Sequence, residues 1–325
     1  MSYRVFLTGT GIAEQARALL DESNCRVEVG DPTDKVSDLV TKLQAFDPHG
    51  LIVRQGNITG EVQRAAPSLQ VICKHGVGTD NIDVESATRR GIPVLFTPGA
   101  NFRSAAEHTV ALILSLLRRI ATQDRRVRRG IFDKTDYDGQ ELTGKTLGLI
   151  GFGRIARRVA ELVGPFDCHV LVYHPSRIDE PLPAYVFKTG SVSEVLERAH
   201  IISFHCPLNA ATRALISARS IATMRQGALL INTARGEIIN EEDLIAALRM
   251  GRLGGAALDV FQEEPLPPQH PLLGMENVIV TMHVAGMSDR SYLNMGLLSV
   301  ESFLAVLQGR SLDMTALLNP EALQR

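Results

Sequence analysis

The sequence predicts an α/β protein built from two doubly wound parallel sheets. Short apolar runs alternate with helix-like segments along nearly all of the chain, which is typical of parallel strands separated by helices. The length of 325 residues exceeds what a single compact core usually holds. A glycine-rich turn from strand to helix stands in the middle of the chain, which indicates that a second sheet begins there.

The first hundred residues are predicted to form the first sheet. Its strands are expected at 5–8, 26–29, 51–54, 71–74 and 93–96, with helices such as 13–21 and 34–46 between them. Gly9 and Gly11 follow the first strand, but the acidic residue that should end the next strand of a dinucleotide site is missing, since Glu28 falls within its strand. We therefore interpret Gly9 and Gly11 as an ordinary strand-to-helix turn.

The rest of the chain is predicted to form the second sheet and to return to the first. An amphipathic segment at 104–119 and a polar stretch at 123–140 precede strands at 146–150, 169–173, 201–205, 228–232, 256–260 and 278–281. Helices are expected at 155–163, 192–199 and 241–250, the last one capped by Asn240, and at 291–308. The predicted domains are 1–100 with 286–325, and 101–285.

Composition indicates a soluble globular protein and argues against nucleic acid or membrane partners. The net charge is −2, 45% of residues are hydrophobic, and the longest apolar run, 110–117, is far shorter than the ~20 residues of a membrane span. Six arginines within 118–129 are interpreted as a solvated helix face. A strand begins by Arg4 and the four cysteines form no Cys-x-x-Cys pair, so we expect no signal peptide, no metal and a cytoplasmic location.

The mid-chain turn is the strongest single motif. The strand at 146–150 runs into Gly151-Phe152-Gly153-Arg154-Ile155-Ala156. Gly151 permits the tight turn, Gly153 lets the backbone approach a phosphate, and Ala156 takes the place of the glycine that packs helix on strand. The backbone N–H groups and the dipole at the helix N-terminus favour a pyrophosphate. We therefore predict a dinucleotide site at Gly151, Gly153, Arg154 and Ile155.

Polar residues follow the other strands of this sheet. Ligands of open parallel sheets bind beyond the carboxyl ends of the strands, which here are followed by Gly151, His174, Pro207, Arg235, Asp259 and His283. Arg235 and His283, together with Glu264, form a plausible hydride-transfer site.

Ordered motifs along essentially the whole chain resemble the D-isomer-specific 2-hydroxyacid dehydrogenases. They are the Gly-Val-Gly-Thr-Asp-Asn-Ile-Asp segment 76–83, the turn 151–156, His-Cys-Pro-Leu at 205–208, Asn-Thr-Ala-Arg-Gly at 232–236, the acidic segment 259–265 and Thr-Met-His at 281–283. Met282 stands where proline is common in the family. The resemblance implies a flavodoxin-like substrate domain, a Rossmann domain that binds NAD or NADP, and hydride transfer between nicotinamide and C2 of a small D-2-hydroxy or 2-oxo acid.

The resemblance and the chemistry assign the catalytic and substrate-binding roles. His283 is expected to take the hydroxyl proton during oxidation and to return it during reduction, while Glu264 stabilises the imidazolium and fixes the tautomer. Arg235 would hold the substrate carboxylate and polarise the C2 oxygen. The backbone N–H groups of Val77 and Gly78 would bind the other carboxylate oxygen. Arg54 matches a position that holds substrate anions in some relatives, and with Lys74 it could favour a phosphate, sulfonate or second carboxylate. The alternative is that Lys74 forms only a structural ion pair.

The resemblance also assigns further residues to the cofactor. Asp259 is expected to accept from the nicotinamide carboxamide, and the remaining expected contacts are Cys206, Pro207, Thr212, Thr233, Ala234 and His283. One departure concerns His174, which stands where NAD-dependent members usually place Asp or Glu on the ribose. Without that carboxylate, Ser176 and Arg177 could bind a 2′-phosphate, and we favour NADP. The alternative is NAD, with His174 hydrogen-bonded to its ribose.

Other functions and the assembly state follow from the same resemblance. Corepressors of this family use the fold as cofactor-sensing binding proteins, and we keep that reading as the alternative to an enzyme. Formate dehydrogenases of the family carry glutamine before the proline, so Glu264 argues against formate. Segment 104–119 resembles the family's dimerisation helix, which indicates a homodimer. The sequence continues only briefly past the last predicted helix, so we expect no C-terminal regulatory domain.

Overall fold

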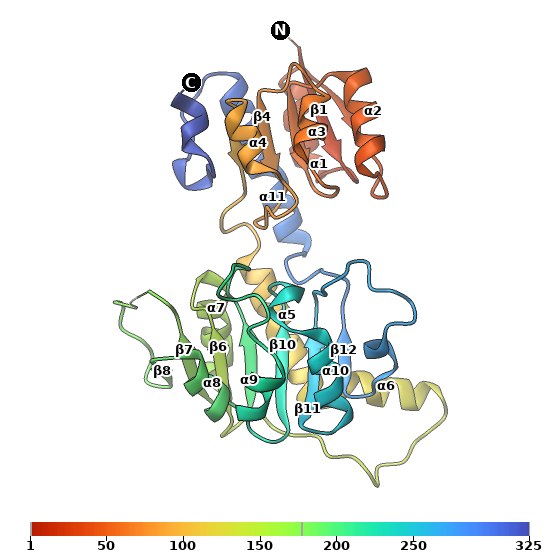
Figure 1. The fold of residues 1–325 in the computed structure, drawn as a ribbon, viewed down its shortest axis with the longest axis vertical. Coiled ribbons are helices and arrows are strands. Elements are labelled where there is room, and N and C mark those ends of the chain that lie inside the picture. The colour runs from red at the N-terminus through yellow and green to blue at the C-terminus, as the bar shows by residue number, and fades with distance from the viewer. Residues whose placement is uncertain (1, 177, 325) are drawn as a thin grey trace. The chain divides into compact units, whose positions relative to one another are not determined.

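The computed structural model describes residues 2–176 and 178–324, which divide into two compact units (Figure 1). The first unit contains residues up to 101 together with those from 287 onward, drawn in red to orange and dark blue. The second unit, 102–286, is drawn from yellow through green to light blue. Each unit is built around one parallel sheet. The predicted fold class of two parallel α/β sheets is therefore confirmed.

The first unit has a five-stranded sheet in the order β2-β1-β3-β4-β5. Its strands are β1 (Tyr3–Thr8), β2 (Cys25–Val29), β3 (Gly50–Val53), β4 (Val71–Lys74) and β5 (Val94–Leu95). Its helices are α1 (Glu14–Glu22), α2 (Val36–Phe46), α3 (Gly60–Arg64), α4 (Val84–Arg89) and α11 (Asp289–Leu307). This strand order is the flavodoxin-like one, with a reversal between β1 and β3.

Both faces of this sheet are buried because successive side chains of a strand point in opposite directions. Phe6 of β1 packs into the cluster with α2 and α3, whereas Val5 and Leu7 pack into the cluster with α1 and α11. Phe303 of α11 is fully buried, and Gly50 leaves the space that its ring occupies. The last long helix therefore belongs to the core of the unit in which the chain begins.

The second unit has a seven-stranded parallel sheet in the order β12-β11-β10-β9-β6-β7-β8. Its strands are β6 (Thr146–Ile150), β7 (His169–Tyr173), β8 (Val186–Lys188), β9 (Ile201–Phe204), β10 (Ala228–Asn232), β11 (Leu253–Leu258) and β12 (Val278–Val280). Its helices are α5 (Phe102–Leu117), α6 (Ile120–Arg128), α7 (Arg154–Val163), α8 (Val192–Arg198), α9 (Ala218–Thr223) and α10 (Glu241–Arg249). The strand order reverses between β6 and β9, and a crevice for a ligand forms at such a point.

Three details differ from the sequence prediction. The polar stretch at 123–140 begins inside helix α6, where Arg128 pairs with Asp124 one turn away at 2.8 Å. The strand predicted at 256–260 begins earlier, at Leu253, because glycines at 254 and 255 let the neighbouring backbone approach. Four short elements, α3, α4, α9 and β8, were not predicted, since they are too short for a periodic pattern to emerge.

In the described ranges, no helix has the length and apolar character to cross a bilayer.

Candidate active site

The turn between β6 and α7 has the geometry of a phosphate-binding loop. Gly151 has a φ of +91°, and a Cβ there would lie 2.5 Å from the carbonyl oxygen of His205. No protein atom lies within 4 Å of the Cβ position at Gly153, so this side of the turn is open to a ligand. Ala156 is fully buried against the sheet. These residues therefore fit a dinucleotide pyrophosphate at the first N–H groups of α7.

The loop after β9 is shaped by its own side chains. Thr212 Oγ1 donates to the Pro207 carbonyl at 2.7 Å and accepts the Asn209 N–H at 2.8 Å. His205 bonds to Ser203 Oγ at 3.0 Å, and desolvation lowers its pKa to about 4, so its ring is neutral near pH 7. Burial raises the pKa of the Cys206 thiol to about 11. The His205 and Cys206 side chains therefore serve as uncharged walls of this loop.

The end of β7 borders an open hollow of about 460 Å³. His174 and Ser176 line it, and the Ser176 N–H donates to His174 Nδ1 at 3.2 Å. Arg177, which was also predicted here, lies outside the described residues. Lys188 and Asp179 line the same hollow, and Lys188 Nζ donates to the Ile178 carbonyl. Sequence reasoning missed Lys188 because it lies on β8, a strand of three residues that carries no clear pattern.

Glu264 and His283 form a hydrogen-bonded pair in the second unit. Glu264 Oε2 lies 2.8 Å from His283 Nδ1, and Glu264 Oε1 accepts the Phe261 N–H at 3.0 Å. Partial burial opposes ionisation of Glu264, but the bonds from His283 and Phe261 and the charges of His283 and Arg235 prevail and lower its pKa. An ionised carboxylate only accepts hydrogen bonds, so Nδ1 carries a proton and Nε2 is left for chemistry. The His283 side chain is 52% exposed.

Arg235 stands just beyond the end of β10. Buried Asn232 brackets this turn, because its amide donates to the Arg235 carbonyl at 2.8 Å and accepts the Ala234 N–H at 3.0 Å. The half-buried Arg235 guanidinium donates to the Ala234 carbonyl at 2.6 Å. Its charge contributes to the lowered pKa of Glu264, so these two side chains are within electrostatic reach. Nearby, Thr233 Oγ1 bonds to Thr109 Oγ1 at 3.1 Å.

Asp259 is fully buried and holds the loop that carries His283. Its carboxylate accepts the Thr281 hydroxyl at 2.5 Å and the N–H groups of Val284 and Ala285 at 2.9 and 2.8 Å. Its own carbonyl accepts the His283 N–H at 2.8 Å. His108 Nε2 lies 3.2 Å from the Thr281 hydroxyl and 3.7 Å from Asp259. Sequence reasoning had assigned Asp259 to the cofactor and had missed this structural task.

The candidate substrate residues of the first unit lie at or just beyond the ends of strands β3 and β4. Arg54 donates to the Gly11 carbonyl at 2.5 Å and to the Thr10 hydroxyl, and its guanidinium lies 5.1 Å from the centre of the Tyr292 ring. This guanidinium occupies the turn after β1 that mimics a dinucleotide motif. Lys74 Nζ donates to Asn81 Oδ1 at 2.8 Å.

The loop after β4 presents the two residues predicted to donate backbone N–H groups to the substrate. Val77 is 40% exposed and Gly78 is half-buried. The neighbouring His75 ring is buried, and burial together with the charges of Arg54 and Lys74 lowers its pKa to about 4. His75 is therefore neutral near pH 7 and packs beneath the loop.

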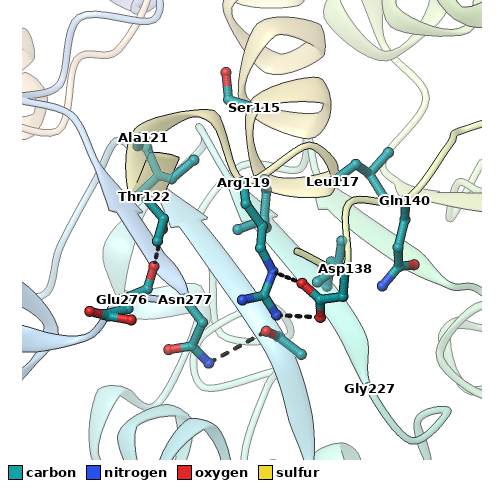
Figure 2. A pocket seen from close by; sticks show the side chains of 14 residues that line it. Ser115, Leu117, Arg119, Ala121, Thr122, Asp138, Gln140, Gly227, Glu276 and Asn277 are labelled. Carbon is teal, nitrogen blue, oxygen red and sulfur yellow. Dashed lines mark hydrogen bonds and ion pairs between the residues drawn. The ribbon is translucent and has the colours of Figure 1, made fainter. Parts of the chain in front are cut away.

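A separate cavity of about 160 Å³ lies at the amino ends of three strands of the second sheet (Figure 2). Its lining includes Gly227, Gly254 and Asn277, which lie where β10, β11 and β12 begin. Arg119 and Asp138 face each other across it and form an ion pair at 2.6 Å. Because Arg235, Asp259 and His283 follow the opposite ends of these strands, this cavity is not part of the candidate active site.

Comparison with known proteins identifies the family. Residues 110–285 match the family model described as "D-isomer specific 2-hydroxyacid dehydrogenase, NAD binding domain". The glyoxylate reductase of Thermofilum pendens is 41% identical over 82% of this chain and 80% of its own length. The D-3-phosphoglycerate dehydrogenase of Archaeoglobus fulgidus is 34% identical over 93% of this chain, which spans 57% of that relative.

A solved structure agrees with these matches, whereas none of them supports the corepressor-type alternative. The crystal structure of the TT0316 protein from Thermus thermophilus superposes with a TM-score of 0.88 at 35% identity, covering 95% of this chain and 98% of that one. The chain therefore belongs to the D-isomer specific 2-hydroxyacid dehydrogenase family, and it is an oxidoreductase that transfers hydride between a nicotinamide cofactor and C2 of a small 2-hydroxy or 2-oxo acid.

Proposed function

We propose that Arg235, Glu264 and His283 carry out this reaction on a small D-2-hydroxy acid or its 2-oxo counterpart. The observation that carries the proposal is the 2.8 Å bond between the lowered-pKa carboxylate of Glu264 and His283 Nδ1. That bond leaves Nε2 of an accessible imidazole to exchange one proton with the substrate. The bound nicotinamide supplies the hydride to C2 in reduction and accepts it in oxidation.

The chain's own residues handle charge and the proton. In reduction, the Arg235 guanidinium holds the substrate carboxylate and stabilises negative charge as it develops on the C2 oxygen. His283 donates its Nε2 proton to that oxygen and keeps the Nδ1 proton bonded to Glu264. In oxidation, Nε2 takes the hydroxyl proton, and the ionised Glu264 stabilises the imidazolium that results.

The remaining site residues are proposed to bind cofactor and substrate. Gly151, Gly153 and the N–H groups of Arg154 and Ile155 would hold the pyrophosphate. Cys206, Pro207, Thr212, Thr233, Ala234 and Asp259 would border the rest of the dinucleotide. Arg54 and the N–H groups of Val77 and Gly78 would bind the anionic groups of the substrate.

We propose a preference for NADP over NAD, based on the hollow beside His174. No carboxylate directly ends β7, and the Lys188 ammonium and the Ser176 hydroxyl lie on the rim, although Asp179 shares it. Removing a cation from this rim should weaken NADPH binding and spare NADH. The test is the ratio of dissociation constants for the two cofactors in the wild type and in Lys188→Gln. An NADH preference in the wild type would contradict the proposal.

We also propose a cytoplasmic homodimer. The buried face of α5 is already occupied by its own unit, where it packs against α7. The apolar side chains that follow are exposed, with Ile120 at 54%, Val127 at 53% and Phe132 at 81%. Several exposed apolar side chains on one stretch of chain favour a site of association. The cytoplasmic location rests on the four cysteines, all of which are free thiols.

The test of the proposed function is the oxidation of NADH or NADPH by purified protein with a panel of 2-oxo acids. The panel contains glyoxylate, hydroxypyruvate, pyruvate, phosphohydroxypyruvate and sulfopyruvate. We expect turnover with at least one member, and the ranking reports whether Arg54 and Lys74 favour a second anionic group. Absence of turnover with all of them, in protein shown to bind cofactor, would contradict the proposed substrate class.

A further inference from the structure

The loop that carries Glu264 lacks regular structure between the end of β11 and the short helix that begins at Pro271. Glu264 itself is on the surface of its unit, with a side chain 36% exposed. A carboxylate on an irregular, exposed loop needs other contacts to keep a 2.8 Å bond to His283. Those contacts come from the segment 236–241, which directly follows Arg235.

A buried carboxylate at the start of α10 provides the main contact. Glu241 is only 9% exposed, and its Oε1 accepts the backbone N–H of Gln262 at 2.6 Å. Its Oε2 lies 3.3 Å from His270 Nε2, near the far end of the same loop. One carboxylate therefore fastens the loop at two points on either side of Glu264. Hydrogen bonds to an ionised group are stronger than neutral ones, which suits this task.

Two further contacts fix the same stretch of backbone. Gln262 Nε2 donates to the Ile239 carbonyl at 2.8 Å. The backbone of Gly236 lies so close to the loop that a Cβ there would overlap the Phe261 carbonyl group. The residue after Arg235 and the residues before Glu264 are therefore in direct backbone contact, which fixes the distance between the two functional segments.

The connection from Glu241 to the reacting group is short. Gln262 lies two residues before Glu264, and the neighbouring Phe261 N–H donates to Glu264 Oε1 at 3.0 Å. Glu264 Oε2 then holds His283 Nδ1. We propose that Glu241 is a positioning residue that, through Gln262, holds Glu264 in register with His283. This inference rests on the proposed function of Glu264 and His283.

The first test is structural and does not depend on activity. Hydrogen exchange across residues 259–271 is compared in wild type, Glu241→Gln, Glu241→Ala and the control Glu242→Gln, whose exposed side chain lies beside Glu241 on the same helix. We expect faster exchange of the Gln262 amide in Glu241→Ala, a smaller increase in Glu241→Gln, and none in the control. Unchanged exchange in both Glu241 variants would overturn the proposal.

The second test separates positioning from general stability. We expect Glu241→Ala to lower kcat roughly tenfold to a hundredfold, the cost of a small misplacement of a reacting group, while cofactor affinity stays the same. In a Glu264→Gln background the same substitution should lower kcat much less, because the residue through which it acts is already gone. An equal loss in both backgrounds would overturn the proposal.

The outcomes distinguish this inference from the proposed function. A wild type without turnover removes the proposed function, whereas an active wild type with unaffected Glu241 variants removes only the positioning role. If Glu241→Ala does not fold, the cycle is run with the near-isosteric Glu241→Gln, for which we expect a smaller loss with the same non-additivity. Additive loss in that cycle would again overturn the proposal.

Discussion

His283 has a φ of +56°, a backbone conformation that residues other than glycine adopt only where their surroundings hold them. Asp259 provides those surroundings, because its carbonyl and carboxylate accept hydrogen bonds from His283, Val284 and Ala285. The cost of this strained position is of order 1–3 kcal/mol, and buried hydrogen bonds to a charged acceptor offset it. His283 is thus fixed through its backbone by Asp259 and through its ring by Glu264.

The lowered pKa of Glu264 predicts how the free energy of unfolding depends on pH. Its pKa is lowered below the ordinary 4.5, so its ionised form is favoured by the folded state. Its contribution to the free energy of unfolding is therefore fully present above about pH 4.5 and is lost as the pH falls through the lowered pKa. We expect Glu264→Gln to flatten the dependence of unfolding free energy on pH in this acid range. The matched control is Glu263→Gln, an exposed neighbour, which should leave the curve unchanged.

Chemical denaturation at a series of pH values measures both curves. A Glu264→Gln curve that keeps the wild-type slope below about pH 4.5 would show that Glu264 titrates alike in the folded and unfolded chain. The hydrogen bond to His283 would then not favour the ionised form of Glu264 in the folded chain.

At the scale of single elements, the turn between β6 and α7 contains two glycines with different roles, one for the fold and one for the cofactor. Gly151 needs its positive φ and has no room for a Cβ, so Gly151→Ala should destabilise the fold by about 1–3 kcal/mol. Gly153 has an ordinary backbone and open space around its Cβ position, so Gly153→Ala should fold as stably as wild type. Both variants should bind cofactor more weakly, the second because a methyl group intrudes on the pyrophosphate.

Thermal unfolding and cofactor titration of the two variants check this pair. Unimpaired cofactor affinity in Gly153→Ala would mean that the open side of this turn does not face the pyrophosphate. An equal loss of stability in both variants would contradict the distinction between them.

The elements also show what the sequence could and could not predict. Strands such as β6, β7 and β10 were placed at their observed limits, because buried parallel strands are continuous apolar runs with clear polar ends. The six arginines within 118–129 were interpreted as a solvated helix face, but the bounds of α6 were not predicted, because its polar residues continue without a break into the stretch up to 140. Strand β8 is too short to leave a periodic signal, and Lys188 was missed with it.

The same limit applies to the site. Arg235 and His283 were predicted from motifs at strand ends and Glu264 from the acidic segment 259–265, and the structure places Glu264 against His283. The supporting contacts of Asp259, Asn232 and Glu241 could not be predicted, because each joins residues that are close only after the loops fold. The residues around the hollow beside His174 could not be predicted either, because they come from both β7 and β8, which are brought together only by folding.

At the scale of the whole molecule, the exposed apolar side chains around α6 predict association of two copies. Phe132 is 81% exposed and Ile131 is 44% exposed, although neither is needed for the core of its own unit. We expect Phe132→Asp to shift the protein from dimer to monomer in light scattering after gel filtration, because a buried charge at an interface is costly. The control Phe187→Asp changes another exposed aromatic, on β8, and should leave the mass unchanged. A wild type that is monomeric at high concentration would contradict the predicted dimer.

The proposed reaction of the molecule depends on one proton at His283 Nε2. The most direct measurement is the single-turnover rate of reduced cofactor with the preferred 2-oxo acid, in wild type and in His283→Asn. With cofactor at saturating concentration, loss of the proton donor should slow this rate by roughly 10²–10⁴. A wild-type rate in His283→Asn would contradict the assignment of His283 as the acid and base of the reaction.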